Sequence, residues 1–210
     1  MKIFTETCCT TLEEALAAQA RGTSRIELCV NLAVGGTTPP PELIQDVVGA
    51  CSIPVNVLIR TTAREFSTAD FVYDDETVGR MVEEIGWCRK YGAAGVVIGA
   101  LNPDGSIDME AMRRMIAAAR PLSVTFHRAF DVSTQDASEA LEAIIGLGCE
   151  RLLTSGKEAT AWEGRDLIAR LVDQAGGRLI VMPGSGVKPH NLPALLAATH
   201  ATEFHGTSIP

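Results

Sequence analysis

Residues 2–30 read KIFTETCCTTLEEALAAQARGTSRIELCV and contain a strand, a helix and a second strand in that order. The runs 2–8 and 25–30 are short and rich in β-forming residues, whereas 12–19 has the apolar spacing of an amphipathic helix. Gly22 follows the helical run, at the place where a left-handed cap residue is favoured. The stretch predicts one βα unit and the strand that begins the next.

The same alternation continues along the chain. Further β-rich runs occupy 54–60, 95–100, 123–128, 151–156, 179–184 and 201–206. Amphipathic segments occupy 43–48, 77–90, 109–119, 137–147, 166–174 and 192–197. Eight strands with seven helices predict a (β/α)8 TIM-type barrel that fills residues 1–210 as a single domain, because an open doubly wound sheet usually has about five or six strands. The helix that would follow the eighth strand is expected to be missing from this chain.

The composition fits an ordinary soluble domain, with 46% hydrophobic, 21% charged and 5% aromatic residues. A net charge of −8 without a basic stripe argues against a nucleic-acid partner. We expect no membrane association and a cytoplasmic location, because there is neither a signal-like leader nor an apolar run of roughly 18 residues. Six cysteines in a chain of this size are expected to be reduced thiols rather than a disulfide scaffold.

The first two strands end alike, since Glu6 precedes Cys8 by two residues and Glu27 precedes Cys29 by two. Side chains in a strand alternate between its faces, so each glutamate shares a face with its cysteine, and both pairs are predicted to point at one place. Cys9 is predicted to face the other way.

Two thiolates are the soft donors that Cu(I) prefers, whereas Zn(II) usually takes more His or Cys ligands. Cys8 and Cys29 are therefore the candidate metal ligands, and we expect their sulfur atoms to stand some distance apart without metal. A packing role stays open for each thiol, because cysteine is among the most buried residue types. Packing is the predicted role of Cys51, Cys88 and Cys149.

The C-terminal strand ends of a barrel build its functional site. The polar residues predicted there, besides the two cysteines, are Glu6, Glu27, Arg60, His127, Arg128, Thr154, Ser155, Gly156, Gly184, Ser185, Gly186, Glu203 and His205. Charged groups inside a barrel are costly unless they are paired or hydrated, so this set predicts a polar mouth that includes Glu6, Arg128, Glu203 and His205. A buried ion-pair cluster without function is the alternative.

Two kinds of chemistry are predicted at this mouth. Glu27 or His127 could move protons, although a histidine beside carboxylates can equally be a structural hydrogen-bonding group. The glycine-rich turn within 182–187 exposes backbone N–H groups where barrel enzymes often hold a phosphate, and 154–156 with Arg60 could help to bind an anion. Short Gly-Ser turns are also ordinary loop chemistry. The long connection over 61–75, which carries Arg64, Glu65, Phe66 and Tyr73, is expected to be either a lid or a surface excursion.

Several of these residues lie in motifs of one family. The stretches are ETC at 6–8, RIELC at 25–29, GGTTP at 35–39, VTFHRAFD at 124–131, RLLTSG at 151–156 and EFH at 203–205. In combination they resemble the CutC family of copper homeostasis proteins along essentially the whole chain. The resemblance implies a TIM-type barrel, a cytoplasmic location, a homodimer, and Cu(I) binding by Cys8 and Cys29.

The sequence departs from the family pattern at two places. Residues 61–66 read TTAREF where relatives usually have PRGGDF, and Gly206 stands where a cysteine is often found. The first change affects the loop after the third strand, and the second removes a possible third thiol.

Three functions remain open from the sequence. The first is Cu(I) binding by the two cysteines with His127 or Glu27 in the outer shell. The second is a lyase or isomerase that acts on a small anionic or phosphorylated substrate without an organic cofactor, with Glu27, His127 and Arg60 as catalytic residues. The third is an interaction scaffold.

Overall fold

The computed structural model describes residues 3–62 and 66–209. Its parallel strands form one sheet in the order β7-β6-β5-β4-β3-β2-β1-β8, so that β7 and β8 come together and nearly close a barrel. The strands are β1 (Phe4–Cys9), β2 (Arg25–Leu28), β3 (Val55–Leu58), β4 (Gly95–Ile98), β5 (Ser123–Phe126), β6 (Arg151–Thr154), β7 (Ile180–Pro183) and β8 (Glu203–Gly206). The predicted (β/α)8 fold is confirmed.

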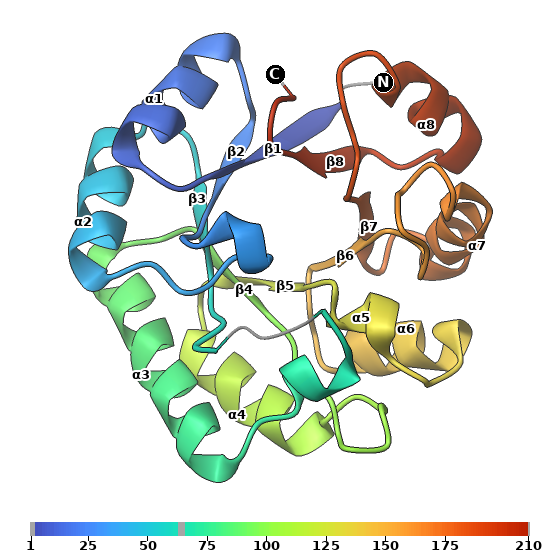
Figure 1. The fold of residues 1–210 in the computed structure, drawn as a ribbon, viewed down its shortest axis with the longest axis horizontal. Helices are drawn as coiled ribbons and strands as arrows, with labels where there is room; N and C mark the ends of the chain where they lie inside the picture. Colours follow the sequence, from blue (N-terminus) through green and yellow to red (C-terminus); the bar gives the residue numbers. More distant parts are fainter. Residues whose placement is uncertain (1–2, 63–65, 210) are drawn as a thin grey trace.

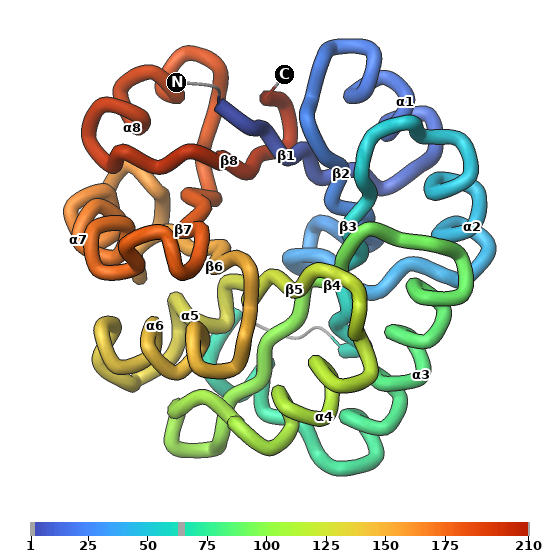
Figure 2. The backbone as a smooth tube through the Cα atoms, turned by 180° about the vertical axis from the view of Figure 1, so that it is seen from behind, coloured from blue at the N-terminus to red at the C-terminus, as the bar shows by residue number. Residues whose placement is uncertain are grey.

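Helices surround the strands on the outside, as the ribbon and the view from behind both show (Figures 1 and 2). They are α1 (Leu12–Arg21), α2 (Pro41–Ala50), α3 (Asp75–Tyr91), α4 (Met109–Ala119), α5 (Ala129–Val132), α6 (Ala137–Gly146), α7 (Arg165–Ala175) and α8 (Leu192–Thr199). Two 3-10 turns, η1 (Leu32–Val34) and η2 (Thr68–Phe71), lie in the loops after β2 and β3. Both loops lie toward the viewer in Figure 1, over the C-terminal strand ends.

The seven long helices coincide with the seven predicted segments, and Gly22 caps α1 in the left-handed conformation with φ 95°. The short helix α5 was not predicted, because four residues are too few to show a helical period. The predicted strands from the second to the seventh are too long at their C-terminal ends, where for example residues 29–30 and 155–156 belong to loops. Arg64 and Glu65 of the predicted lid lie outside the described residues. Among the described residues after β8, none is helical, and no helix in the described ranges is long and apolar enough to cross a bilayer.

Strand alternation divides the core into two parts. Outward-facing residues such as Cys9, Leu28 and Val57 pack with the helices in one large apolar cluster. Inward-facing Cys8 belongs to a separate small cluster inside the barrel, with Cys29, Leu58 and Val97. The prediction that Cys8 and Cys9 face opposite ways is confirmed. Cys51, Cys88 and Cys149 all pack in or against the outer cluster, as predicted.

Candidate metal centre and ligand cavity at the barrel mouth

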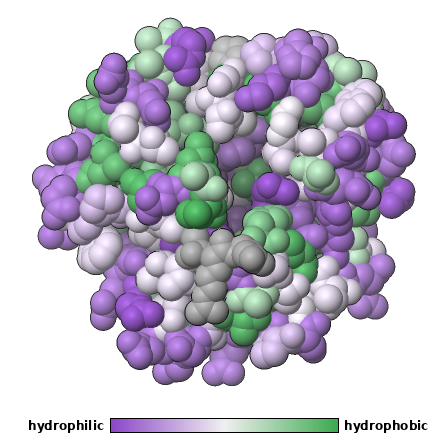
Figure 3. Space-filling view, viewed as in Figure 1, coloured by the Kyte–Doolittle hydropathy of each residue, from purple (hydrophilic) through white to green (hydrophobic). Residues whose placement is uncertain are grey.

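A cavity of about 220 Å³ opens at the C-terminal end of the barrel. Its walls come from β1, β2, β3, β4, β6 and β8 and from the loops that follow β2, β3, β5, β7 and β8. The space-filling view shows the surface hollowed near the middle of this face (Figure 3). This volume lies below the roughly 300–1,000 Å³ of typical drug-sized sites, so the cavity suits an ion or a small molecule. We call it the mouth cavity.

The two candidate thiols meet in this cavity. The Cys8 Sγ lies 3.3 Å from the Cys29 Sγ, and both side chains are buried. The expectation that the sulfur atoms stand apart without metal is therefore wrong. Strand register explains the contact: Cys8 of β1 pairs with Glu27 of β2, so Cys29 lies just beyond that pair on the same face. The sulfur contact is compatible with a thiol–thiol hydrogen bond.

Gly36 covers the thiol pair from the loop after β2. It has φ +88°, and a Cβ there would lie 2.8 Å from Leu58 Cδ2 and 3.3 Å from Cys29 Sγ. Only glycine fits both the left-handed backbone and this close approach. The GGTTP motif thus supplies the glycine that packs against Cys29, a role that its sequence alone does not indicate.

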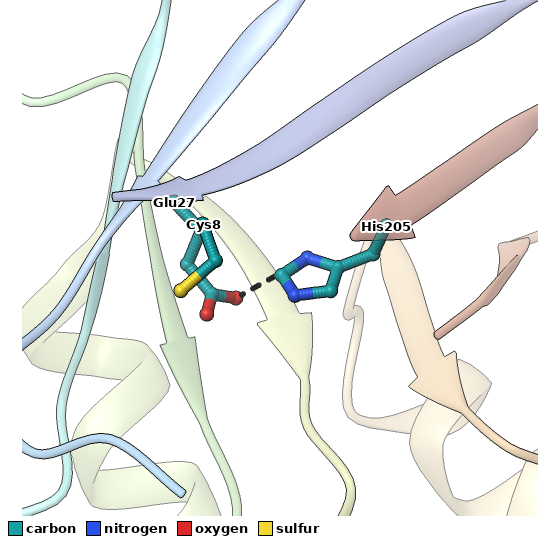
Figure 4. Close-up of side chains that lie close together, drawn as sticks. All are labelled: Cys8, Glu27 and His205. Carbon is teal, nitrogen blue, oxygen red and sulfur yellow. Dashed lines mark ion pairs between the residues drawn. The ribbon is translucent and has the colours of Figure 1, made fainter. Parts of the chain in front are cut away.

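The surroundings keep the Cys8 thiol protonated. Its hydrogen bond with Cys29, its burial and the nearby Glu27 carboxylate all raise the pKa of Cys8 above its ordinary value. One ligand atom from each of Cys8, Glu27 and His205 lies within 4.8 Å of the others, and Figure 4 shows the three side chains converging from β1, β2 and β8. Thiols, a carboxylate and an imidazole therefore face the same small volume.

Glu27 is buried with little hydrogen bonding. Its Oε2 has no hydrogen-bond partner among the described residues and lies 3.9 Å from Nδ1 of His205. Burial raises the pKa of Glu27 to about 7. His205 donates instead to Glu6 Oε1 at 3.0 Å; burial lowers its pKa, but the Glu27 and Glu6 carboxylates outweigh burial and leave it raised. The imidazole is thus held mainly by Glu6.

His127 is a neutral donor at the end of β5. Its Nδ1 accepts the backbone N–H of Ala129 at 3.2 Å, which assigns the ring proton to Nε2. That Nε2 is buried without a partner among the described residues. Burial and the positive charge of Arg60 lower the pKa of His127 to about 3. The ring occupies the space that a side chain at Gly99 would need, since a Cβ there would lie 2.5 Å from Nδ1.

Arg60 at the end of β3 is largely committed to the protein. One terminal nitrogen donates to the carbonyls of Val34 and Gly36 at 2.9 and 3.0 Å, and the other forms a buried ion pair with Asp70 of η2. Its Nε is buried without a partner within the described part of the chain. Arg60 therefore anchors the two mouth loops, and one N–H of this cavity-lining residue stays unpaired among the described residues.

Glu6 and Glu203, predicted at the mouth, lie below it. Arg25 joins them, with Nε 2.5 Å from Glu6 and a terminal nitrogen 2.6 Å from Glu203, and Arg151 lies 2.8 Å from Glu203. Asn56 adds a hydrogen bond to Glu6 at 3.3 Å. We call these five residues the floor network. Burial raises the pKa of Glu6, but His205 and Arg25 outweigh it and hold the pKa at about 2.

Donors of the TSG motif at 154–156 are directed to a carboxylate of the chain itself. Asp131 accepts the Thr154 hydroxyl at 2.5 Å and the Ser155 backbone N–H at 3.0 Å. Arg128 pairs with Asp131 at 2.8 Å and donates to the Ser155 hydroxyl at 3.1 Å. Asp131 therefore occupies the position that the sequence suggested for a bound anion.

The second predicted anion-binding turn does face the mouth cavity, through Ser185 and Gly186. Its neighbours Val187 and Lys188, and Thr207 after β8, line the same wall. Val187 belongs to the predicted turn at 182–187, whereas sequence reasoning missed Lys188 and Thr207, although Lys188 follows the glycine-serine turn by two residues. The catalytic roles predicted for Glu27, His127 and Arg60 stay predictions.

Fold and site together define a (β/α)8-barrel protein with a buried thiol pair in a small cavity at its C-terminal mouth. A profile of the CutC family matches residues 3–210. This chain belongs to the CutC family, as its motifs indicated.

Named relatives support this assignment over most of their length. The copper homeostasis protein cutC homolog of Homo sapiens is 46% identical over 200 residues, which are 95% of this chain and 71% of that protein. A CutC family protein of Parabacteroides distasonis is 45% identical over 206 residues, 98% of this chain and 82% of that protein. A crystal structure of CutC from Streptococcus agalactiae matches with a TM-score of 0.91 at 32% identity, covering 99% of this chain and all (100%) of the other. An aldolase, QR15, shares only the fold, with a TM-score of 0.71 at 15% identity over 98% of this chain and 90% of its own.

Proposed function

We propose that this protein binds Cu(I) through the thiolates of Cys8 and Cys29, as part of copper homeostasis. The observation that carries the proposal is the Sγ–Sγ distance of 3.3 Å between two buried thiols that line one cavity. Membership of a family whose relatives are named for copper homeostasis gives the metal.

The geometry suits an ion held by two sulfur atoms. With metal–sulfur bonds of about 2.3 Å, two sulfurs can be at most about 4.6 Å apart, in a linear arrangement. At 3.3 Å the same bonds would enclose an angle of roughly 90°, so a modest separation of the two sulfurs admits the ion. Thiolates are soft ligands, which favours Cu(I) over harder divalent ions.

The neighbouring groups complete this picture. Glu27 and His205 each place a ligand atom within 4.8 Å of Cys8 Sγ, but Glu6 already holds the His205 Nδ1 at 3.0 Å. We therefore assign the two thiolates as ligands and place Glu27 outside the ligand set, as a neighbouring carboxylate whose charge raises the pKa of Cys8. His127, whose Nδ1 already accepts the backbone N–H of Ala129, is assigned no part in holding copper.

A cytoplasmic location and a homodimer belong to the same proposal. Cu(I) coordination requires both thiols to be reduced, and the cytoplasm is the compartment that keeps thiols reduced. The family resemblance supports the homodimer, which light scattering of the purified protein would test.

The test is a Cu(I) titration of the fully reduced protein against a competing chelator. We expect one tight equivalent in the unaltered protein and its loss in the double variant Cys8→Ser/Cys29→Ser. Cys9→Ser is the matched control, because Cys9 lies next to Cys8 in the chain but packs outside the barrel. Equal affinity in the double variant and the control would refute the two-thiol site.

A further inference from the structure

The mouth cavity contains hydrogen-bond donors that copper binding does not use. They belong to the turn after β7, to Lys188 and to the buried side chains of His127 and Arg60, all of which line the cavity. A Cu(I) ion takes up electron-pair donors, not N–H groups, so these groups require a different explanation.

The turn after β7 is fixed by hydrogen bonds of two backbone carbonyls and one hydroxyl, and its backbone N–H groups take no part in them. The Ser185 carbonyl accepts from Ala161 at 3.0 Å, the Ser185 hydroxyl donates to Ala159 at 2.8 Å, and Asn191 donates to the Gly186 carbonyl at 2.9 Å. Ser185 and Gly186 both have left-handed φ, 75° and 72°. Within the described residues, the backbone N–H groups of 185–187 donate to no protein atom. Successive free N–H groups in such a turn form a concave site for an anion.

Lys188 adds a positive charge beside this turn. Its backbone N–H is fixed by the Asn191 side chain at 2.8 Å, and its Nζ lies 3.3 Å from the Thr207 hydroxyl. No carboxylate pairs with Lys188 in the part of the chain that the structure describes. The turn, the ammonium group and a hydroxyl thus combine in one wall of the cavity.

The second observation is independent of this loop. His127 is 5% exposed, its Nε2–H has no partner among the described residues, and the ring lines the mouth cavity. The Arg60 side chain is also buried, and its Nε–H likewise has no partner among the described residues. Leaving a buried donor unpaired is unfavourable, and a ligand oxygen in the cavity would remove this cost.

We propose that the mouth cavity binds a small phosphorylated compound, whose phosphate lies on the 185–187 turn and Lys188 and whose carbonyl or carboxylate oxygen accepts from His127 Nε2–H. The two ends use chemically different donors: free backbone N–H groups with an ammonium suit a phosphate, and a neutral imidazole N–H suits an oxygen of lower charge. The cavity of about 220 Å³ limits the ligand to a few carbon atoms between these ends. None of these hydrogen-bond donors belongs to the thiol pair, so the proposed site does not depend on Cys8 or Cys29.

The probe is 2-phosphoglycolate, which carries a phosphate and a carboxylate on two carbons; inorganic phosphate and glycolate serve as its two halves. Titrations monitor the imidazole Nε2–H resonance of His127 by NMR and the affinity by calorimetry, on the reduced, copper-free protein. We expect 2-phosphoglycolate to bind at least tenfold more tightly than either half and to shift the Nε2–H resonance.

Two variants separate the ends of the site. Lys188→Met should weaken 2-phosphoglycolate and inorganic phosphate by at least tenfold, whereas His127→Asn should weaken 2-phosphoglycolate and leave inorganic phosphate within twofold. Lys90→Met, on the outer surface of α3, is the matched control for loss of a lysine and should change nothing.

The thiol variant keeps this inference separate from copper binding. Cys8→Ser/Cys29→Ser should bind 2-phosphoglycolate as the unaltered protein does, and Lys188→Met should keep its Cu(I) affinity. Absence of 2-phosphoglycolate binding at millimolar concentration, or binding that Lys188→Met leaves unchanged, would overturn the inference without affecting the copper site.

Discussion

The floor network and the mouth cavity are two polar regions of one barrel interior, and they differ in how their charges are satisfied. In the floor network, Arg25 and Arg151 pair with Glu6 and Glu203 at 2.5–2.8 Å. In the mouth, Glu27 Oε2, Arg60 Nε and His127 Nε2 are buried without hydrogen-bond partners among the described residues. The floor therefore has paired charges, as a structural core requires. The mouth has unpaired polar atoms, which a bound ligand could satisfy.

This contrast distinguishes a structural group of polar residues, the floor network, from a candidate binding group in the mouth cavity. Buried polar groups in folded proteins are almost always hydrogen-bonded, so a cluster of exceptions needs an explanation. Three of the five unpartnered buried atoms in the described residues, those of Glu27, Arg60 and His127, belong to side chains that line one cavity. The functionless ion-pair cluster considered from the sequence describes the floor well and the mouth poorly.

The largest expected effect comes from breaking the floor. Arg25→Met leaves the buried carboxylates of Glu6 and Glu203 without their shared partner, and it should lower the free energy of unfolding by about 3–5 kcal/mol. Urea unfolding at neutral pH measures this. Arg178→Met is the matched control, because Arg178 pairs with Glu142 on the surface, where water screens the pair, and its loss should lower the free energy of unfolding far less. Equal losses in the two variants would contradict the structural role of the floor.

The mouth should make the fold sensitive to acid through His127. Burial and Arg60, with Arg128, hold its folded pKa at about 3, below the roughly 6.5 of an unfolded chain. Between these values the unfolded chain binds a proton that the folded protein does not, so stability is lost as pH falls from about 6.5 toward 3.

The measurement for this prediction is the free energy of unfolding at pH 7 and pH 4. His127→Asn should reduce the loss over this interval by roughly 2–3 kcal/mol relative to the unaltered protein. His190→Asn, at an exposed position, should reproduce the unaltered profile. An unchanged profile in His127→Asn would show that the imidazole is not held neutral.

Cu(I) affinity should depend on pH, because the ion displaces thiol protons. The pKa of Cys8 is raised by its bond with Cys29 and by burial, so the proton is still bound at neutral pH. Each proton released gives about a tenfold gain in apparent affinity per pH unit. Chelator competition between pH 6 and pH 8 measures the slope. Cys8→Ser should bind more weakly and with a flatter slope, whereas an identical slope would exclude Cys8 as a ligand.

The smallest expected effect is on the stability of the cavity wall. Lys188→Met should change the free energy of unfolding by no more than about 0.5 kcal/mol, because the side chain is partly exposed and makes one hydrogen bond. Thermal unfolding checks this value. A loss comparable to that of Arg25→Met would place Lys188 in the structural framework instead of the binding wall.

Local pattern was sufficient to predict much of this molecule. The eight strands and seven long helices follow from period and turn residues, and alternation in β1 and β2 placed Cys8 and Cys29 on the inner face. What the local pattern predicted wrongly is the distance between the thiols, which are in contact. That distance depends on the register that pairs Cys8 with Glu27, which is a property of two strands together.

The fate of each charge also depends on partners that are distant in sequence. Glu6 and Glu27 have the same local pattern, a glutamate two residues before a cysteine. Glu6 lies opposite Arg25 in the strand register and has a pKa of about 2, whereas Glu27 lies opposite Cys8 and has a pKa of about 7. Asp131 likewise fills the TSG turn from more than twenty positions away along the chain. These pairings appear only when the barrel is assembled.

The most direct measurement is X-ray absorption at the copper edge of the Cu(I)-loaded protein, with Cys9→Ser as the loaded control. The two-thiol site predicts two sulfur neighbours to copper, in the unaltered protein and in the control alike, and one or none in Cys29→Ser. A copper ion surrounded by nitrogen and oxygen only, or a sulfur count that Cys29→Ser leaves unchanged, would contradict the assignment of Cys8 and Cys29.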